Sequence, residues 1–190
     1  MSDLDTPEML RQELVRLIAE RAFIRDRLAA SSRVSGAAFV DTKYVTLHPR
    51  GASIIARFLL KRLRDLGLQS VGGVSVGGIP IVSAIVAMSD EEDWPVTGFF
   101  LRKPSEHAEH AKEIEGNLEP GTAVAFVEDV ISGGRSTLGA LRTVEAAGCT
   151  VKRVFVVVDR EEGGPENLQK AGYDVEALVT ISQIEEFLED

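Results

Sequence analysis

Residues 124–137 read Val-Ala-Phe-Val-Glu-Asp-Val-Ile-Ser-Gly-Gly-Arg-Ser-Thr. The first four residues are uniformly apolar, which is typical of a buried strand in a parallel sheet. Two adjacent carboxylates, Glu128 and Asp129, follow, and a run of glycines and hydroxyl side chains then leads into a helical stretch. In an open α/β sheet, ligands bind at the carboxyl ends of the strands, beside the N-termini of the helices that follow. The stretch therefore predicts a ligand site in which the carboxylates suit vicinal ribose hydroxyls and the glycine turn suits a phosphate.

Apolar segments of the same kind recur on both sides of this stretch. We expect strands at residues 71–76, 96–101, 123–127, 154–158 and 177–181, and helices at residues 6–28, 49–66, 79–88, 136–147 and 165–171. Near-continuous apolar strands that alternate with helices indicate right-handed βαβ units. We therefore predict a doubly wound α/β fold with a mainly parallel sheet and helices on both faces, preceded by an N-terminal helical segment.

The bulk composition limits the class of protein. A chain of 190 residues is long enough for one sizeable core, so we expect a single domain over residues 1–190. A net charge of −9 disfavours binding to nucleic acid or to an anionic membrane, so the expected partners are small molecules. The acidic start lacks the basic region of a signal peptide, and the lone Cys149 excludes an internal disulfide. We therefore expect a cytoplasmic protein.

The motif at residues 124–137 resembles the signature with which type I phosphoribosyltransferases bind 5-phosphoribosyl-1-pyrophosphate (PRPP). It lacks the Gly-Lys-Ser/Thr ending of a P-loop and the G-x-G-x-x-G spacing of a dinucleotide site. Three further segments resemble the orotate branch of that family. Residues 72–80 are similar to its pyrophosphate loop, although an ordinary glycine-rich turn has the same pattern. Residues 157–164 are similar to the segment whose arginine recognises the base, and residues 35–50 to the segment that covers the base.

The resemblance implies a glycosyltransferase that converts orotate and PRPP to orotidine monophosphate and pyrophosphate in pyrimidine nucleotide synthesis. It implies a base-covering part at residues 1–48 and an α/β core at residues 49–190. It also implies a homodimer, and Mg²⁺ that is carried by PRPP rather than by a metal site made of protein side chains. The implied PRPP-binding residues are Glu128, Asp129, Val130, Ile131, Ser132, Gly133, Gly134, Arg135, Ser136, Thr137, Arg102, Lys103, Gly77 and Gly78; Lys103, Arg102 and Asp129 are the implied catalytic residues, and Ser132, Arg160 and Phe39 would bind the base.

The base-binding part departs from the family pattern. Arg160 would form a paired hydrogen bond to a planar carboxylate edge, but a surface pair with Glu161 or Glu162 is an open alternative. Phe39 would stack on a pyrimidine ring, whereas alanine occupies position 38, where a first aromatic is usual. The lysine that normally follows Ser-Gly is missing, and Lys43 is either its substitute or a surface residue.

The polar segment at residues 102–121 resembles the mobile catalytic loop, and the alternative is a disordered excursion. Glu106 stands where a second lysine is expected, and Ala108 stands at the usual histidine position. Since each charge-stabilising donor in such sites contributes about 3 kcal/mol, Glu106 would weaken stabilisation of the leaving pyrophosphate. Three hypotheses stay open: an orotate phosphoribosyltransferase, a phosphoribosyltransferase for a different base, and a PRPP- or nucleotide-sensing protein that has lost catalysis.

Overall fold

The computed structural model describes residues 6–24, 39–91, 93–102 and 113–189. The helices are α1 (Pro7–Arg21), α2 (Lys43–Thr46), α3 (Pro49–Asp65), α4 (Gly78–Glu91), α5 (Arg135–Ala146), α6 (Gly164–Lys170) and α7 (Ile181–Glu189). The strands are β1 (Phe23–Ile24), β2 (Phe39–Val40), β3 (Ser70–Val74), β4 (Thr97–Leu101), β5 (Ile114–Gly116), β6 (Ala123–Ile131), β7 (Thr150–Asp159) and β8 (Val175–Thr180).

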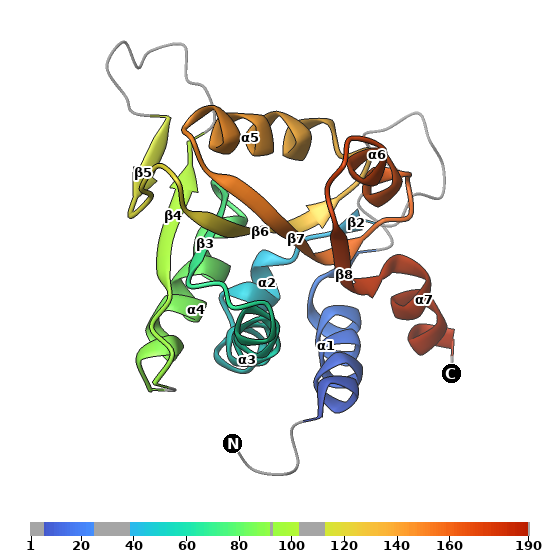
Figure 1. Ribbon diagram of the computed structural model, residues 1–190. Coiled ribbons are helices and arrows are strands. Elements are labelled where there is room, and N and C mark those ends of the chain that lie inside the picture. The colour runs from blue at the N-terminus through green and yellow to red at the C-terminus, as the bar shows by residue number, and fades with distance from the viewer. Residues whose placement is uncertain (1–5, 25–38, 92, 103–112, 190) are drawn as a thin grey trace.

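The central sheet has the strand order β5-β4-β3-β6-β7-β8 (Figure 1). β4, β3, β6, β7 and β8 run parallel, and β5 pairs antiparallel with β4 at one edge. From β3 the chain adds β4 on one side, and it later returns to add β6, β7 and β8 on the other side. The order therefore reverses between β3 and β6, which is where an open α/β sheet binds its ligand.

Helices cover both faces of the sheet, as predicted. α5 and α6 lie on one face, and α1, α3, α4 and α7 lie on the other (Figure 1). Side chains along β6 alternate between the two hydrophobic clusters: Val124 and Phe126 belong to the cluster that includes α5, and Ala125 and Val127 belong to the cluster that includes α3 and α4. The predicted doubly wound α/β fold is confirmed.

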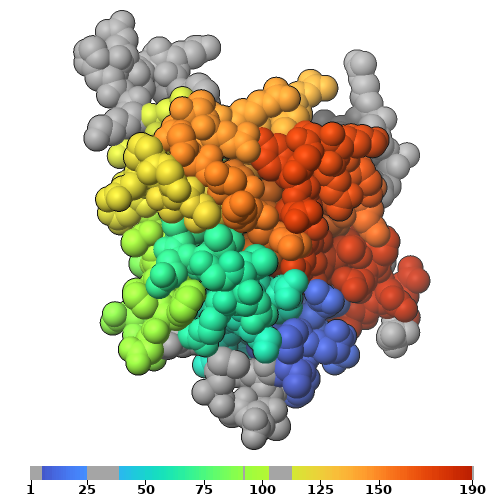
Figure 2. Space-filling model, in the orientation of Figure 1, coloured from blue at the N-terminus to red at the C-terminus, as the bar shows by residue number. Residues whose placement is uncertain are grey.

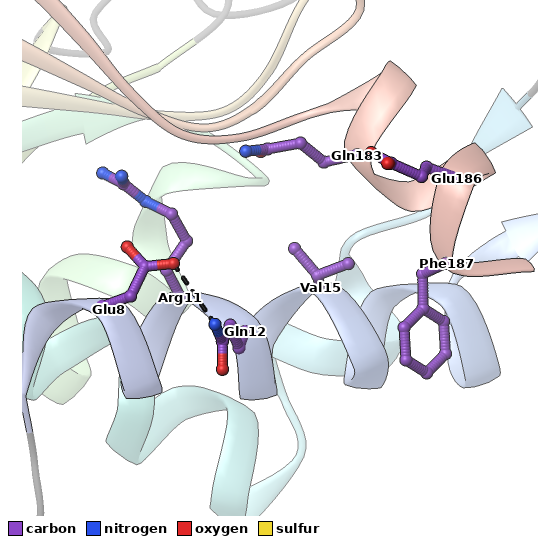
Figure 3. A pocket seen from close by; sticks show the side chains of 7 residues that line it. All are labelled: Glu8, Arg11, Gln12, Val15, Gln183, Glu186 and Phe187. Atoms are coloured by element: carbon purple, nitrogen blue, oxygen red, sulfur yellow. Dashed lines mark hydrogen bonds between the residues drawn. The ribbon is translucent and has the colours of Figure 1, made fainter. Parts of the chain in front are cut away.

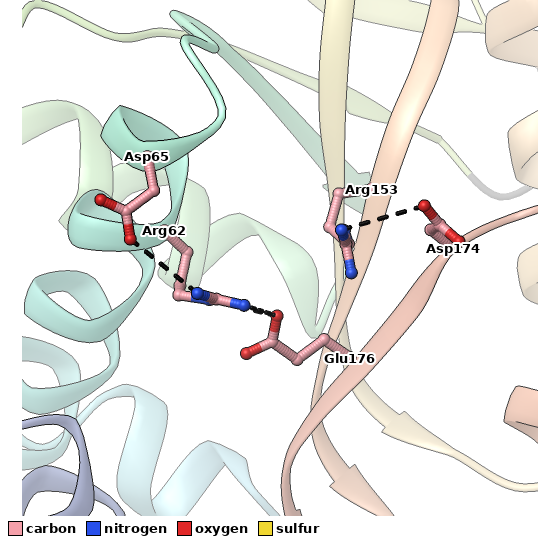
Figure 4. Close-up of polar contacts among 5 residues, drawn as sticks. All are labelled: Arg62, Asp65, Arg153, Asp174 and Glu176. Atoms are coloured by element: carbon pink, nitrogen blue, oxygen red, sulfur yellow. Dashed lines mark hydrogen bonds and ion pairs between the residues drawn. The ribbon is translucent and has the colours of Figure 1, made fainter.

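The two ends of the described chain pack together, because α1 lies against α7 (Figure 2). α1 begins as expected, with the Thr6 hydroxyl accepting a hydrogen bond from the Met9 N–H. An ion pair fastens α3 to β8, with Arg62 Nη2 lying 2.6 Å from Glu176 Oε2 (Figure 4). None of the helices in the described ranges is long and apolar enough to cross a membrane.

Several predicted boundaries are wrong. β6 extends past residue 127 to Ile131, because Glu128, Val130 and Ile131 pair with β7. The first helix ends at Arg21 rather than at residue 28, because Phe23 pairs with Val40 in the short β1–β2 ladder.

Other elements were not predicted. Part of the segment at residues 102–121 forms β5, which was expected to be loop. Ile181 begins a helix, α7, instead of ending a strand. The short elements α2, β1 and β2 were also missed.

Candidate active site

The turns that follow β3, β6 and β7 meet at the carboxyl edge of the sheet. Each turn leads into a helix: α4 after β3, α5 after β6 and α6 after β7. The turn after β3 is tight, since a Cβ atom on Gly78 would lie 2.9 Å from the Cα atom of Gly73. This turn includes a cis peptide bond between Ser75 and Val76, and the Ser75 N–H donates to the carbonyl of Leu101, 2.8 Å away.

Glu128 and Asp129 are the charged residues near the end of β6. Glu128 is 9% exposed and accepts a hydrogen bond from the Thr137 hydroxyl, with 2.9 Å between Oγ1 and Oε2. Asp129 accepts a hydrogen bond from the Thr42 hydroxyl, with 2.8 Å between Oγ1 and Oδ2. Because successive side chains of a strand point to opposite faces, the two carboxylates are held by different elements.

The Asp129 carboxylate also lies against the backbone of Gly77. A Cβ atom on Gly77 would come within 2.2 Å of Asp129 Cγ and 2.3 Å of both carboxylate oxygens. Gly77 is therefore required for space, since the carboxylate fills the position of the missing side chain. The contact brings the turn after β3 next to the end of β6, as the predicted PRPP site requires.

The turn between β6 and α5 has the form of an anion site. Gly134 is the N-cap of α5 and has a φ of 75°, so glycine is favoured there, whereas Gly133 does not adopt positive φ. The N–H groups of the first turn of α5 lack acceptors within the helix, which suits them to a phosphate. Those N–H groups belong to Arg135, Ser136 and Thr137.

The first turn of α6 contacts the turn between β6 and α5. The Asn167 amide donates to the carbonyl of Gly133 at 3.1 Å, and a Cβ atom on Gly164 would lie 2.3 Å from the carbonyl oxygen of Ser132. Among the predicted PRPP-binding residues, Val130 and Ile131 pack their side chains in the two hydrophobic clusters. The Thr137 hydroxyl donates to Glu128.

Arg160 lies close to the end of β6. Its N–H donates to the carbonyl of Ile131 at 3.0 Å, which ties the turn after β7 to the neighbouring turn. Its guanidinium lies 2.8 Å from Glu162 Oε1, so the pairing with a glutamate left open by the sequence is present. Beside it, burial raises the pKa of Asp159, and an N–H donated by Glu161 at 2.9 Å opposes the rise.

Two candidate residues lie in the N-terminal segment. Phe39 pairs with Ile24 in the β1–β2 ladder and is 37% exposed, so part of its side chain is accessible at the surface. Lys43 Nζ lies 2.6 Å from Asp41 Oδ1, and this hydrogen bond raises the pKa of Lys43, with a smaller contribution from the charge of Asp129. Lys43 is therefore held as a cation by Asp41, within electrostatic reach of Asp129.

Arg102 directly follows the last residue of β4, Leu101. Its N–H donates to the carbonyl of Glu113 at 3.0 Å, and its guanidinium lies 3.4 Å from Glu115 Oε1. Both side chains of this ion pair are substantially exposed, so the pair contributes at most about 1 kcal/mol and Arg102 can exchange its partner. The predicted residues Lys103, Glu106 and Ala108 lie outside the described residues. In the described ranges, no group of three or more His, Cys, Asp or Glu side chains could hold a metal ion.

A separate pocket of about 450 Å³ lies between α1 and α7 (Figure 3). Its lining combines apolar and charged side chains, and the Gln12 amide donates to Glu8 at 3.4 Å. The lining residues are Glu8, Arg11, Gln12, Val15, Gln183, Glu186 and Phe187. All of them belong to the two helices, so this pocket is distinct from the turns at the strand ends.

The parallel sheet, whose strand order reverses between β3 and β6, and the turns after β3, β6 and β7 together define a phosphoribosyltransferase of type I. A solved structure with the same architecture is the orotate phosphoribosyltransferase of Mycobacterium tuberculosis H37Rv in complex with PRPP; it superposes with a TM-score of 0.73 at 27% identity and covers 93% of this chain and 92% of that one. No protein-family model matches the sequence.

Curated relatives narrow the assignment. The orotate phosphoribosyltransferase of Nostoc sp. is 35% identical over 178 residues, which span 93% of this chain and 86% of the relative. That of Aquifex aeolicus is 34% identical over 177 residues, spanning 92% of this chain and 97% of the relative. The chain belongs to the orotate phosphoribosyltransferase family.

The sequence did not indicate Thr42 as a site residue. It lies 87 positions from Asp129, and a single threonine after an aspartate carries no motif. The available signal was the apolar spacing around it, since Val40 and Val45 are both buried and place the segment against the core.

Proposed function

We propose that this chain transfers the 5-phosphoribosyl group of PRPP to orotate, giving orotidine monophosphate and pyrophosphate. The observation that carries the proposal is the end of β6, where Glu128 and Asp129 precede a glycine turn into the N-terminus of α5. The curated relatives named as orotate phosphoribosyltransferases and the PRPP complex of the Mycobacterium tuberculosis relative support it.

Different residues of the site bind different parts of PRPP. The Glu128 and Asp129 carboxylates accept hydrogen bonds from the ribose hydroxyls. The N–H groups at the start of α5 and the hydroxyls of Ser132 and Ser136 bind the 5-phosphate. The backbone N–H groups of Gly77 and Gly78, in the turn that leads from β3 into the N-terminus of α4, bind the pyrophosphate.

In the reaction, a ring nitrogen of orotate gives up its proton to water and forms a bond to C1 of the ribose. The bond between C1 and the pyrophosphate oxygen breaks, and its electron pair leaves with the pyrophosphate. Arg102 exchanges Glu115 for the pyrophosphate and, with Lys103, stabilises the negative charge that develops there. Mg²⁺ carried by PRPP would supply further positive charge to the leaving pyrophosphate, and the acidic side chains of the site orient the ribose.

The base is recognised by Arg160, with Phe39 and Ser132 beside it. The planar guanidinium donates two parallel hydrogen bonds to the orotate carboxylate, a geometry that lysine cannot reproduce. To do so, Arg160 exchanges Glu162 for the substrate, so Glu162 holds the side chain in place between turnovers.

We also propose that the protein works as a cytoplasmic homodimer. Large apolar side chains are exposed at the surface near the proposed site: Tyr44 is 59% exposed, Leu47 69% and Val76 67%. Contact with a second copy would remove this surface from water. Light scattering coupled to size-exclusion chromatography tests the dimer, and a monomer at working concentration would count against it.

The experiment that tests the reaction follows the loss of orotate absorbance with PRPP and Mg²⁺. Arg160→Lys keeps the charge but loses the paired donors, so the KM for orotate should rise by at least about tenfold. Glu162→Gln is the matched control and should leave that KM unchanged or lower it. A panel of purine and pyrimidine bases tests the use of another base. No turnover with orotate at high enzyme and Mg²⁺ concentrations would refute the proposal.

A further inference from the structure

We infer that Thr42 is a positioning residue for Asp129, and that it couples the N-terminal segment to the ribose site; this inference rests on the proposed function. Thr42 is 1% exposed and stands at the N-cap position of α2. An N-cap threonine commonly uses its side-chain oxygen to accept an N–H of its own helix. Thr42 makes no such bond, and its hydroxyl donates to Asp129 Oδ2 at 2.8 Å.

Asp129 is held on two sides by this arrangement. The Thr42 hydroxyl fixes one oxygen, and the backbone of Gly77 lies against the whole carboxyl group. Within the described part of the chain, Oδ1 accepts no hydrogen bond, which leaves it for a ribose hydroxyl. Thr137 holds Glu128 in the same manner from α5. Each carboxylate of the motif therefore has one threonine that sets its orientation.

The positions of the two partners give Thr42 a role that Thr137 does not have. Thr137 lies inside the PRPP motif, nine residues from Glu128, whereas Thr42 comes from the segment that starts at Phe39. Val40 and Val45 are buried on either side of Thr42, so the segment is anchored in the core. A carboxylate that is oriented before PRPP binds loses less conformational freedom on binding. Loss of the hydroxyl should therefore weaken PRPP binding and affect orotate binding much less.

Two substitutions and a matched control separate the hydroxyl from the packing. Thr42→Val keeps the shape and removes the donor, and Thr42→Ser keeps the donor. Thr46→Val is the control, because Thr46 lies on the same helix, is 3% exposed and has a hydroxyl with no hydrogen-bond partner within the described structure. PRPP binding with Mg²⁺ is titrated by calorimetry for each variant, after thermal unfolding has shown that each is folded.

We expect Thr42→Val to raise the Kd for PRPP by about tenfold, as for loss of a hydrogen bond to a charged group. Thr42→Ser should stay within about threefold of the wild type, and Thr46→Val should match it. At saturating PRPP, the KM for orotate of Thr42→Val should change by less than about twofold.

Three results would overturn the inference. Thr42→Val could bind PRPP as the wild type does, which would mean that the hydroxyl does not matter for binding, or more tightly, which would mean that the contact holds Asp129 away from the ribose. Thr42→Ser could bind as weakly as Thr42→Val, which would assign the effect to packing. A wild type that binds PRPP but does not convert orotate would refute the proposed function alone, and one that does not bind PRPP would refute both.

Discussion

Substitution of Gly77 by alanine tests the geometry of the site directly. The new methyl carbon would lie 2.2 Å from Asp129 Cγ, whereas ordinary contacts between carbon atoms are about 3.5 Å, so the carboxyl group must move by roughly 1 Å. The Thr42 hydroxyl lies 2.8 Å from Oδ2, and a displacement of that size breaks the hydrogen bond. The backbone itself accepts alanine, because Gly77 does not have a positive φ.

The expected loss is large for a single methyl group. A shift of about 1 Å in a substrate-positioning group costs up to about a hundredfold in rate, which corresponds to roughly 2.7 kcal/mol. We expect kcat/KM for PRPP to fall by about ten- to a hundredfold, measured by the loss of orotate absorbance at limiting PRPP. The free energy of unfolding, from urea titration, shows whether the fold is kept.

Gly139→Ala is the matched control. Gly139 lies inside α5, and a Cβ atom there would meet nothing within 4 Å, so alanine should stabilise the protein by about 0.5–1 kcal/mol. Its kcat/KM should equal that of the wild type. If folded Gly77→Ala keeps kcat/KM within about twofold of the wild type, then the orientation of Asp129 does not matter for PRPP, and the reasoning is wrong.

Three further predictions concern stability. Burial raises the pKa of Asp159, so the folded protein binds this proton more tightly than the unfolded chain does, and stability falls as pH rises above the ordinary value of 3.8. Asp159→Asn should therefore raise the free energy of unfolding at neutral pH. It should also flatten the pH dependence of that free energy at acid pH, measured by urea titration. Burial and a hydrogen bond raise the pKa of Tyr173 to about 12, so its contribution is complete below pH 10 and disappears as pH rises toward 12; Tyr173→Phe should reduce the loss of stability in that range, and an unchanged slope would contradict the assignment. Glu176→Gln breaks the 2.6 Å ion pair with Arg62 and should lower the free energy of unfolding by about 1 kcal/mol. Asp174 is 76% exposed and lies 3.8 Å from Arg153, so Asp174→Asn should cost no more than about 0.3 kcal/mol. Equal costs in urea titrations would contradict the comparison.

The fold could be predicted because its signals are local. The apolar run at residues 124–127 and the glycines at 133 and 134 lie within one strand–turn–helix unit, and that unit sets the position of the site. The end of β6 could not be predicted, since acidic residues disfavour strands and only pairing with β7 keeps Glu128 in the ladder. The helix that begins at Ile181 was hidden for a related reason, because an apolar run does not show where a strand ends and a helix begins.

The contacts within the predicted site could be anticipated only in part. Residue types predicted a sugar-phosphate site at the end of β6, but they did not show that the Thr137 hydroxyl donates to Glu128. The contact between Thr42 and Asp129 spans 87 positions and depends on the packing of the N-terminal segment, which no local pattern encodes. The pairing of Arg160 with Glu162 was one of two interpretations allowed by the sequence, and the structure shows this pairing.

The junction between Arg102 and Glu113, at the end of β4, bears on how the enzyme can change in evolution or by engineering. Arg102 and Glu113 are joined by a backbone hydrogen bond of 3.0 Å, and β5 continues the antiparallel pairing with β4 directly below it. Arg102 and Glu113 are therefore fixed next to each other, whatever sequence connects them. The connection can therefore diverge in evolution, or be exchanged for that of another phosphoribosyltransferase by protein engineering, without a change in the register of the sheet. A junction of this kind would let a relative acquire residues such as Glu106 while the framework of the ribose site stays intact.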